Sequence, residues 1–251
     1  PAFYPLSLHD AFPISCGKKV IGAGPANPVA MVDSTADLAK AARDIVQGAA
    51  FDNNLMCTSE KSIVVVNDVA EPFIYELLKN GVYYVKDAAE TEKLMKAAVT
   101  EDGLINKKLE GKSADEILAY AGIKCSSSVK LIVAETKRIH PFATMELLMP
   151  LVALVKAESF EEMLETALEL EQGYKHTATI HSESIEHLNR AAKKMQTSVF
   201  VKNGASLLGI GFDKEGHTSF TIATATGEGT TSARHFARRR SCTLTSGFSI
   251  R

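Results

Sequence analysis

Apolar residues occur in this chain in two alternating patterns, short uninterrupted runs and longer stretches in which they recur every three or four positions. The runs are typical of buried strands, and the longer stretches of helices that cover a core with one face. Strands separated by helices of about ten residues require crossover connections, which make the strands parallel. The pattern therefore predicts an α/β fold, a parallel sheet with helices on both faces. Strands are expected at 62–67, 82–85, 129–135, 150–156, 177–181 and 199–202, and helices at about 34–48, 71–80, 88–99, 114–121, 159–173 and 184–195.

Three of these helices begin with a serine followed three residues later by an acidic residue. This spacing predicts a capping box, in which the serine hydroxyl and the acidic side chain satisfy backbone N–H groups of the first turn. The pairs are Ser34 with Asp37, Ser113 with Glu116, and Ser159 with Glu162.

The start of the chain follows neither pattern. Residues 1–19 contain several prolines and no period, so we interpret them as a leader or remnant that carries no function. Residues 20–28 are expected to be a strand end that opens into a Gly/Pro loop. Gly22 and Gly24 have the spacing of a dinucleotide-binding fingerprint, but the third glycine is absent and Pro25 and Pro28 prevent a helix from starting there. We therefore reject a dinucleotide fingerprint at this point.

Composition and charge narrow the class of protein. The chain has 251 residues, of which 45% are hydrophobic and 23% charged, and a formal net charge of −2. These values are ordinary for one large domain or two small ones, and give no electrostatic reason to expect nucleic acid or a membrane surface as partner. The arginines at 234 and 238–240 are interpreted as a solvated or ion-paired face.

The four cysteines are far apart in sequence, without CxxC or Cys/His spacing. They predict neither a disulfide framework nor a zinc site, and favour a reducing cytoplasm. No apolar run reaches the roughly 20 residues of a membrane span. We expect a cytoplasmic protein without a metal.

One cysteine lies where an α/β enzyme could hold a nucleophile. Cys57 belongs to the polar segment FDNNLMCTSEK, which runs directly into the apolar strand SIVVV. Loops on a rigid sheet often carry catalytic residues, but a free cysteine is also among the most buried residue types. From the spacing alone, Cys57 is either a nucleophile or a core residue.

Four ordered segments resemble one known family. They are GAGPANPVAMVDSTADLAKAARDIVQGAAFDNNLMCTSEK, HPFATMELLMPLVALV, FVKNGAS and SFTIATATGEGTTSARHFARRR. Together they are similar to the CoA-acylating branch of the aldehyde dehydrogenase superfamily, which includes propionaldehyde and acetaldehyde dehydrogenases of propanediol and ethanolamine utilisation. The resemblance covers nearly the whole chain. It implies that the chain is the C-terminal half of a longer protein. The glycine-rich cofactor loop and the asparagine of the oxyanion hole would then lie upstream of this chain.

The resemblance also implies a division of the chain. Residues 20–32 would be the last piece of the nucleotide-binding domain, 33–235 the catalytic domain with the parallel sheet of the aldehyde dehydrogenase fold, and 236–251 a C-terminal β arm for oligomerisation. Within that arm, 242–245 is expected to be strand-like.

Roles for individual residues follow from the resemblance. Cys57 matches the nucleophile, which attacks the aldehyde and forms a thiohemiacetal and then an acyl-enzyme thioester. Its backbone N–H would serve as an oxyanion donor. Glu146 matches the carboxylate that binds the nicotinamide-ribose hydroxyls, and Leu148 would pack near the nicotinamide. His140 is more simply a structural histidine.

Three further residues are expected near the substrate. Asn203 and Phe220 lie in stretches that match the substrate tunnel, although each also reads as an ordinary strand-to-loop transition. Asn54 could orient the loop through its amide, or simply accept a strained turn conformation.

The expected reaction is oxidation of a short-chain aldehyde to acyl-CoA, with NAD as cofactor and coenzyme A as co-substrate. Hydrolytic relatives carry a water-activating glutamate in the loop that corresponds to Gly22–Gly24, and residues 22–28 contain no carboxylate. The two glycines could equally make only a tight turn. The resemblance further implies a homo-oligomer, a dimer or tetramer, and allows location in a bacterial microcompartment. The alternatives are a hydrolytic dehydrogenase, a glutamyl-phosphate-type reductase, and a catalytically silent fragment that binds NAD+ very weakly.

Overall fold

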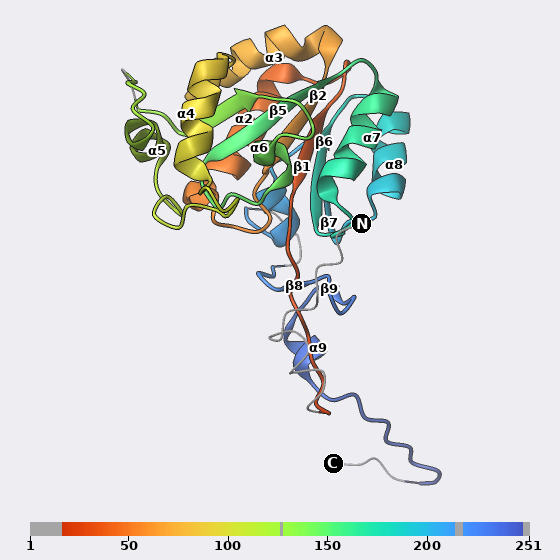
Figure 1. Ribbon diagram of the computed structural model, residues 1–251. Helices are drawn as coiled ribbons and strands as arrows, with labels where there is room; N and C mark the ends of the chain where they lie inside the picture. Colours follow the sequence, from red (N-terminus) through yellow and green to blue (C-terminus); the bar gives the residue numbers. More distant parts are fainter. Residues whose placement is uncertain (1–16, 126–127, 214–217, 248–251) are drawn as a thin grey trace.

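The central element is a seven-stranded sheet in the order β3-β4-β5-β2-β1-β6-β7 (Figure 1). The computed structural model describes residues 17–125, 128–213 and 218–247. Every neighbouring pair of strands in the sheet is parallel, as the alternation of strands and helices predicts. The strands are β1 Val29–Val32, β2 Ser62–Val66, β3 Val82–Val85, β4 Leu131–Glu135, β5 Leu151–Ala157, β6 Thr177–His181 and β7 Val199–Lys202.

Helices cover both faces of the sheet, which confirms the predicted fold class. Successive strand residues alternate between two apolar cores, so that Met31 packs into one and Val32 into the other. The core that contains Val32 is closed by α2 and α3, and the core that contains Met31 by α4 to α8. The helices are α2 Leu38–Ala50, α3 Asn67–Lys79, α4 Ala88–Ala98, α5 Ala114–Tyr120, α6 Pro141–Thr144, α7 Phe160–Glu171 and α8 Ile185–Met195.

Helix capping follows the sequence in two of the three predicted places. Ser113 and Glu116 form the full capping box of α5. Ser159 caps α7 by accepting from the backbone N–H of Glu162, but the Glu162 carboxylate accepts from the N–H of Glu158 at 2.8 Å, so the predicted box is only half formed there. The prediction for α2 is wrong. Its N-cap is Asp37, whose carboxylate accepts from the N–H of Lys40 at 3.0 Å.

The structure corrects the interpretation of the first strand. Residues 20–28 form no strand, whereas Val29–Val32 is β1, which pairs with β2 on one side and β6 on the other. The division of the chain at position 32 into a nucleotide-binding piece and a catalytic domain stays a prediction. Helix α3 also begins four residues earlier than predicted, directly at the end of β2.

Beyond β7 the chain forms the short helix η2, Ser206–Ile210, and then leaves the sheet. The antiparallel pair β8 Ile222–Ala223 and β9 Gly229–Thr230 and the helix α9 Ala233–Phe236 lie below the sheet, beside the segment that leads into β1 (Figure 1). Residues 242–245 form no strand, so that prediction is wrong. The role of 236–251 in oligomerisation stays a prediction, and residues 248–251 lie outside the described ranges.

Gly22 and Gly24 contact this extension rather than forming the tight turn considered from the sequence. The backbone N–H of Gly22 donates to the hydroxyl of Thr226 at 3.0 Å. A Cβ at Gly24 would lie 2.6 Å from the hydroxyl oxygen of Thr224. Glycine at position 24 therefore allows the two segments to approach closely.

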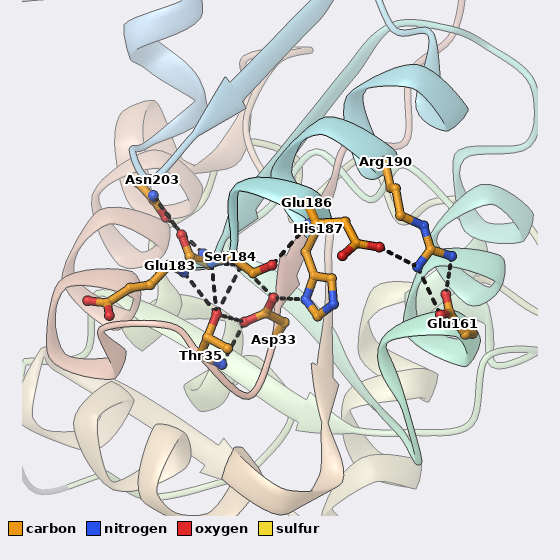
Figure 2. Close-up of polar contacts among 10 residues, drawn as sticks. Asp33, Thr35, Glu161, Glu183, Ser184, Glu186, His187, Arg190 and Asn203 are labelled. Atoms are coloured by element: carbon orange, nitrogen blue, oxygen red, sulfur yellow. Dashed lines mark hydrogen bonds and ion pairs between the residues drawn. The ribbon is translucent and has the colours of Figure 1, made fainter.

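A buried polar cluster lies at the C-terminal ends of the strands (Figure 2). The Asp33 carboxylate follows β1, is fully buried, and accepts from the Ser182 hydroxyl at 2.5 Å and from the N–H and hydroxyl of Thr35 at 2.7 Å. His187 of α8 lies 2.7 Å from the same carboxylate through Nδ1. Asn203, after β7, donates to the Ser182 carbonyl and accepts from its N–H. The cluster thus joins the ends of β1, β6 and β7 to α8.

Candidate active site

The segment that contains Cys57 is a strained loop between α2 and β2. Asp52, Asn53 and Asn54 have positive φ values of 48°, 50° and 64°. Such left-handed conformations favour Asn and Asp, which explains the run DNN at this point. The loop leads into the amino end of β2 and leaves Cys57 half-buried. The structure therefore places Cys57 in a loop rather than in the core.

Asn54 holds this loop from beneath. Its side chain is buried and its amide donates to the carbonyls of Ala49 at 2.7 Å and Glu60 at 2.9 Å. Both alternatives raised from the sequence hold together, since Asn54 accepts the left-handed conformation and orients the loop through its amide. Its polar atoms point into the protein, and its proposed contact with substrate stays a prediction.

Lys61 supplies a buried positive charge under the loop. The side chain is 3% exposed, and Nζ donates to the carbonyl of Asn54 at 2.6 Å, to its Oδ1 at 2.7 Å and to the carbonyl of Met56 at 3.1 Å. Burial lowers the pKa of Lys61 to about 8, although the charges of Glu146, Cys57 and Glu60 oppose this fall.

Glu60 fixes the other side of the loop to η2. Its carboxylate is fully buried and accepts from the backbone N–H and the hydroxyl of Ser206, both at 2.9 Å. Burial raises the pKa of Glu60 to about 7. The carboxylate lies against Gly48 of α2, where a Cβ would stand 2.2 Å from Oε2. Glu60 thus bonds the loop to η2, which is distant in sequence, and packs against α2.

Glu146 acts on Cys57 through its charge. It lies in the loop before β5, where the N–H of Ala26 donates to its Oε2 at 3.4 Å. Burial raises the pKa of the Glu146 carboxyl. Burial likewise raises the pKa of the Cys57 thiol, and the Glu146 carboxylate raises it further, whereas Lys61 and the backbone N–H of Cys57 lower it. The structure therefore brings Cys57, Glu146 and Lys61 into one electrostatic group.

The remaining predicted residues lie in different places. Leu148 follows Glu146 in a left-handed conformation with φ 54°, and its carbonyl accepts from Gly111 at 2.9 Å. Asn203 follows the end of β7, whereas Cys57 precedes β2. In a parallel sheet these are opposite ends of the strands, so Asn203 lies away from Cys57, and its place in a substrate tunnel stays a prediction. Phe220 is 69% exposed beside β8. His140 caps α6, which agrees with a structural role.

Three residues of the site were not singled out from the sequence. Lys61 and Glu60 stand at the end of a polar segment and read as solvated charges. His176, at the start of β6, is buried, and burial followed by the charge of Lys61 lowers its pKa to about 4, so that it is neutral at pH 7. Lys61 and Glu60 could have been found from their position between the turn-forming run DNN and the apolar strand SIVVV.

Three of the four cysteines lie in the part of the chain that the structure describes. Cys57, Cys125 and Cys242 are free, and Cys16 lies outside the described residues. Within the described ranges, no three His, Cys, Asp or Glu side chains are grouped so that they could hold a metal ion. No helix in these same ranges has the length and apolar composition of a membrane span.

Comparison with known families agrees with the predicted resemblance. The model of the aldehyde dehydrogenase family matches residues 15–212. The chain belongs to this family. It is 50% identical over 96% of its length to propanal dehydrogenase (CoA-propanoylating) of Salmonella typhimurium, of which it covers 52%. It is 41% identical over 93% of its length to acetaldehyde dehydrogenase (acetylating) of Escherichia coli, of which it covers 51%.

Solved structures of the family have the same fold. The propionaldehyde dehydrogenase of Rhodopseudomonas palustris with bound propionyl-CoA superposes with a TM-score of 0.89 at 46% identity, over 92% of this chain and 51% of that one. A propionaldehyde dehydrogenase from the fucose utilisation microcompartment of Clostridium phytofermentans gives 0.91 at 40% identity, over 96% and 55%. The chain therefore spans about half the length of the aldehyde dehydrogenases it matches.

Proposed function

We propose that this chain forms the catalytic part of a CoA-acylating, NAD-dependent aldehyde dehydrogenase that converts a short-chain aldehyde, propionaldehyde or acetaldehyde, into acyl-CoA. The observation that carries the proposal is the half-buried Cys57 thiol in a strained loop beside Lys61 and Glu146. Similarity to the CoA-propanoylating and acetylating enzymes supports the choice of substrate and product.

The chemistry at Cys57 follows from that of a thiolate. The sulfur adds to the aldehyde carbon, the C–S bond forms, and the carbonyl π electrons move to oxygen, which gives a thiohemiacetal. The backbone N–H of Cys57 is the donor that this chain offers to that oxygen. After oxidation at the same carbon, the acyl group remains on the sulfur as a thioester.

NAD+, when bound, supplies the hydride acceptor for this oxidation. Glu146 is the residue that would hold it, since one carboxylate can accept from two ribose hydroxyls. The structure fits this role. The Glu146 side chain is partly exposed, and its hydrogen bond from Ala26, at 3.4 Å, is long and leaves acceptor capacity on both oxygens. Leu148, in the same loop, would pack beside the nicotinamide.

CoA rather than water is proposed to release the acyl group. The CoA sulfur attacks the thioester carbon, a new C–S bond forms, and Cys57 leaves as a thiolate. Residues 22–28 contain no carboxylate to activate water. The Glu60 carboxylate is also unsuited to that task, because Ser206 occupies both of its oxygens in a fully buried place. The thioester is thereby left for a thiol nucleophile.

Assembly and location are part of the same proposal. The exposed extension that contains β8, β9 and α9 supports a role in a dimer or tetramer. The similar Clostridium phytofermentans enzyme comes from a bacterial microcompartment, which supports such a location here. Size-exclusion chromatography and imaging of a fluorescent fusion would test these two points.

The experiment that tests the function uses a full-length protein that contains this chain. It is supplied with propionaldehyde and NAD+, with and without CoA, and the products are identified by mass spectrometry. We expect propionyl-CoA when CoA is present and little free propionate when it is absent. Rapid propionate formation without CoA would instead show a hydrolytic dehydrogenase. The matched variant Cys57→Ser should lose turnover, whereas Cys125→Ser should keep it.

A further inference from the structure

We propose that Lys61 is the positioning residue of the nucleophile, because its buried ammonium holds the Cys57 loop in shape and supplies the positive charge that favours the thiolate. This inference rests on the proposed function, since it names the group that activates the nucleophile of that reaction. The residue is four positions after Cys57, at the point where the loop enters β2.

The geometry of Lys61 matches the hydrogen-bonding capacity of an ammonium. Such a group has three N–H donors and no acceptor. Nζ has three acceptors within 3.1 Å, namely the carbonyl and Oδ1 of Asn54 and the carbonyl of Met56. Two of these acceptors belong to Asn54 in the left-handed turn, and the third belongs to Met56, the residue directly before Cys57. The Lys61 side chain therefore fixes the backbone of the loop up to the residue that precedes Cys57. An apolar residue here would leave these buried oxygens without a donor, which is costly.

The charge of Lys61 acts on Cys57 as well as on the two nearby carboxyl groups, Glu146 and Glu60. All three acceptors are neutral oxygens, so the ammonium keeps its charge, and its side chain is 3% exposed. In so dry a place the interaction between charges is much stronger than in water. Four titratable groups face Lys61: Cys57 and Glu60 from its own loop, Glu146 from the loop before β5, and His176 from the loop before β6.

The signs of these interactions agree with the assignment. Lys61 lowers the pKa of Cys57, whereas burial and Glu146 raise it. His176 is neutral near pH 7, because its pKa is about 4, and does not compete with Lys61 as a cation. Among the described residues, Lys61 is thus the cation that lowers the pKa of the Cys57 thiol against the increase caused by Glu146.

The test is the rate at which iodoacetamide alkylates Cys57 as a function of pH. Peptide mass spectrometry follows Cys57 separately from Cys125 and Cys242. This measurement needs no aldehyde, NAD+ or CoA. The role of Lys61 can therefore be refuted while the full-length protein still forms acyl-CoA, and the proposed function can be refuted while Lys61 still affects alkylation.

Removal of the charge should raise the pKa of Cys57. We expect Lys61→Met to slow alkylation at pH 7 about tenfold, the effect of a one-unit rise in thiol pKa. Lys61→Arg keeps the charge and should stay within about threefold of the native rate. The difference between native protein and Lys61→Met should narrow above pH 8, because native Lys61, with a pKa of about 8, then loses its proton. A packing role alone would not produce this dependence.

Lys156→Met is the matched control, since Lys156 of β5 is a partly buried lysine that pairs with Glu71 at 2.9 Å and with Glu135 of β4 at 3.2 Å. It should leave the alkylation profile unchanged. If Lys61→Met does not fold, as circular dichroism will show, Lys61→Gln replaces it and the same expectation holds. A native pH profile in a folded Lys61→Met or Lys61→Gln variant would overturn the proposal. An equal loss in folded Lys61→Arg would overturn it too, because charge would then not be the cause.

Discussion

The carboxylate of Glu60 accepts hydrogen bonds from both the backbone N–H and the hydroxyl of Ser206, each at 2.9 Å, although 146 residues separate them in the chain. Glu60 stands three positions after Cys57, and Ser206 opens the helix η2. The loop that contains Cys57 is therefore fixed from one side by η2 and from beneath by Lys61. A buried carboxylate with two donors is costly to disturb.

Gly48→Ala tests the space that Glu60 needs. In an exposed helix this change would stabilise the protein by about 1 kcal/mol. Here the new Cβ would lie 2.2 Å from Oε2 of Glu60, so the carboxylate would have to leave Ser206. We expect the free energy of unfolding to fall by about 2 kcal/mol, measured by urea denaturation. The neighbouring exposed Gln47→Ala is the control, and a stabilised Gly48→Ala protein would contradict the assigned contact.

Glu146→Gln tests the opposing charge on the nucleophile. The Glu146 carboxylate raises the pKa of Cys57, so its neutral amide should lower that pKa and speed alkylation of Cys57 near pH 7 several-fold, as expected when the thiolate fraction rises. In a full-length protein the same change should raise the KM for NAD+. Glu169→Gln, an exposed change on α7, is the control. Slower alkylation in Glu146→Gln would show that the carboxylate does not act on the thiol as described.

Asp33→Asn tests the cluster at the opposite edge of the sheet (Figure 2). Hydrogen bonds from Ser182, Thr35 and His187 outweigh burial and lower the pKa of Asp33 below its usual value. A lowered carboxyl pKa contributes stability at neutral pH that is lost as pH falls through the folded-state value. We expect Asp33→Asn to lower the free energy of unfolding by about 2 kcal/mol at pH 7, and less under acid conditions.

The matched control is Glu183→Gln, an exposed change beside the same cluster. Because Asp33 and Cys57 lie at opposite edges of the sheet, Asp33→Asn should leave the alkylation rate of Cys57 unchanged in the folded protein. An equal loss of stability in both variants would argue against the Asp33 network as its source.

Buried histidines predict how stability depends on pH. Burial lowers the pKa of both His176 and His181 to about 4. The unfolded chain therefore binds these protons from about pH 6.5 downward, while the folded protein binds them only near pH 4, so stability falls on acidification across that window. Glu60, with a pKa of about 7, has the opposite effect, because the folded protein keeps its proton up to a higher pH than the unfolded chain.

The two histidines outnumber this one carboxyl, so the net contribution of the three groups is a loss of stability toward pH 4. His181→Gln should remove one of the protons whose uptake makes the free energy of unfolding depend on pH. The slope of that free energy against pH should decrease by up to about 1.4 kcal/mol per pH unit. Urea denaturation at a series of pH values measures it, with His235→Gln in α9 as control. A slope unchanged by His181→Gln would contradict the burial of a neutral histidine at this position.

The sequence predicts most of the sheet because its strands are uninterrupted apolar runs buried on both faces. It misses β1, although Val29–Val32 is equally apolar, because the prolines just before it suggested a loop at a domain boundary. Only the pairing of β1 with β2 and β6 shows that this segment is central. Similarly, Asp37 rather than Ser34 caps α2, a choice between two good capping residues that local sequence does not decide.

At the site, Cys57, Asn54 and Glu146 were predicted from the sequence, Cys57 and Glu146 by their resemblance to family residues, and their roles stay predictions. The sequence does not identify Lys61, because a lysine after a polar loop ordinarily remains in water. Its burial depends on the left-handed turn at Asn54, which directs two oxygens inward. The resemblance places Asn203 in the substrate tunnel, which stays a prediction; the direction of the strands shows only that Asn203 and Cys57 lie at opposite ends of the sheet's strands.

We propose that Cys57 carries the acyl group as a thioester until CoA attacks it. The most direct test of this proposal is to incubate a full-length protein that contains this chain with propionaldehyde and NAD+, omit CoA, and measure the mass of the Cys57 peptide. We expect a propionyl adduct on Cys57 that disappears when CoA is added, while propionyl-CoA forms. An adduct on Cys125 or Cys242 instead, or undiminished acyl-CoA formation by Cys57→Ser, would contradict the proposal.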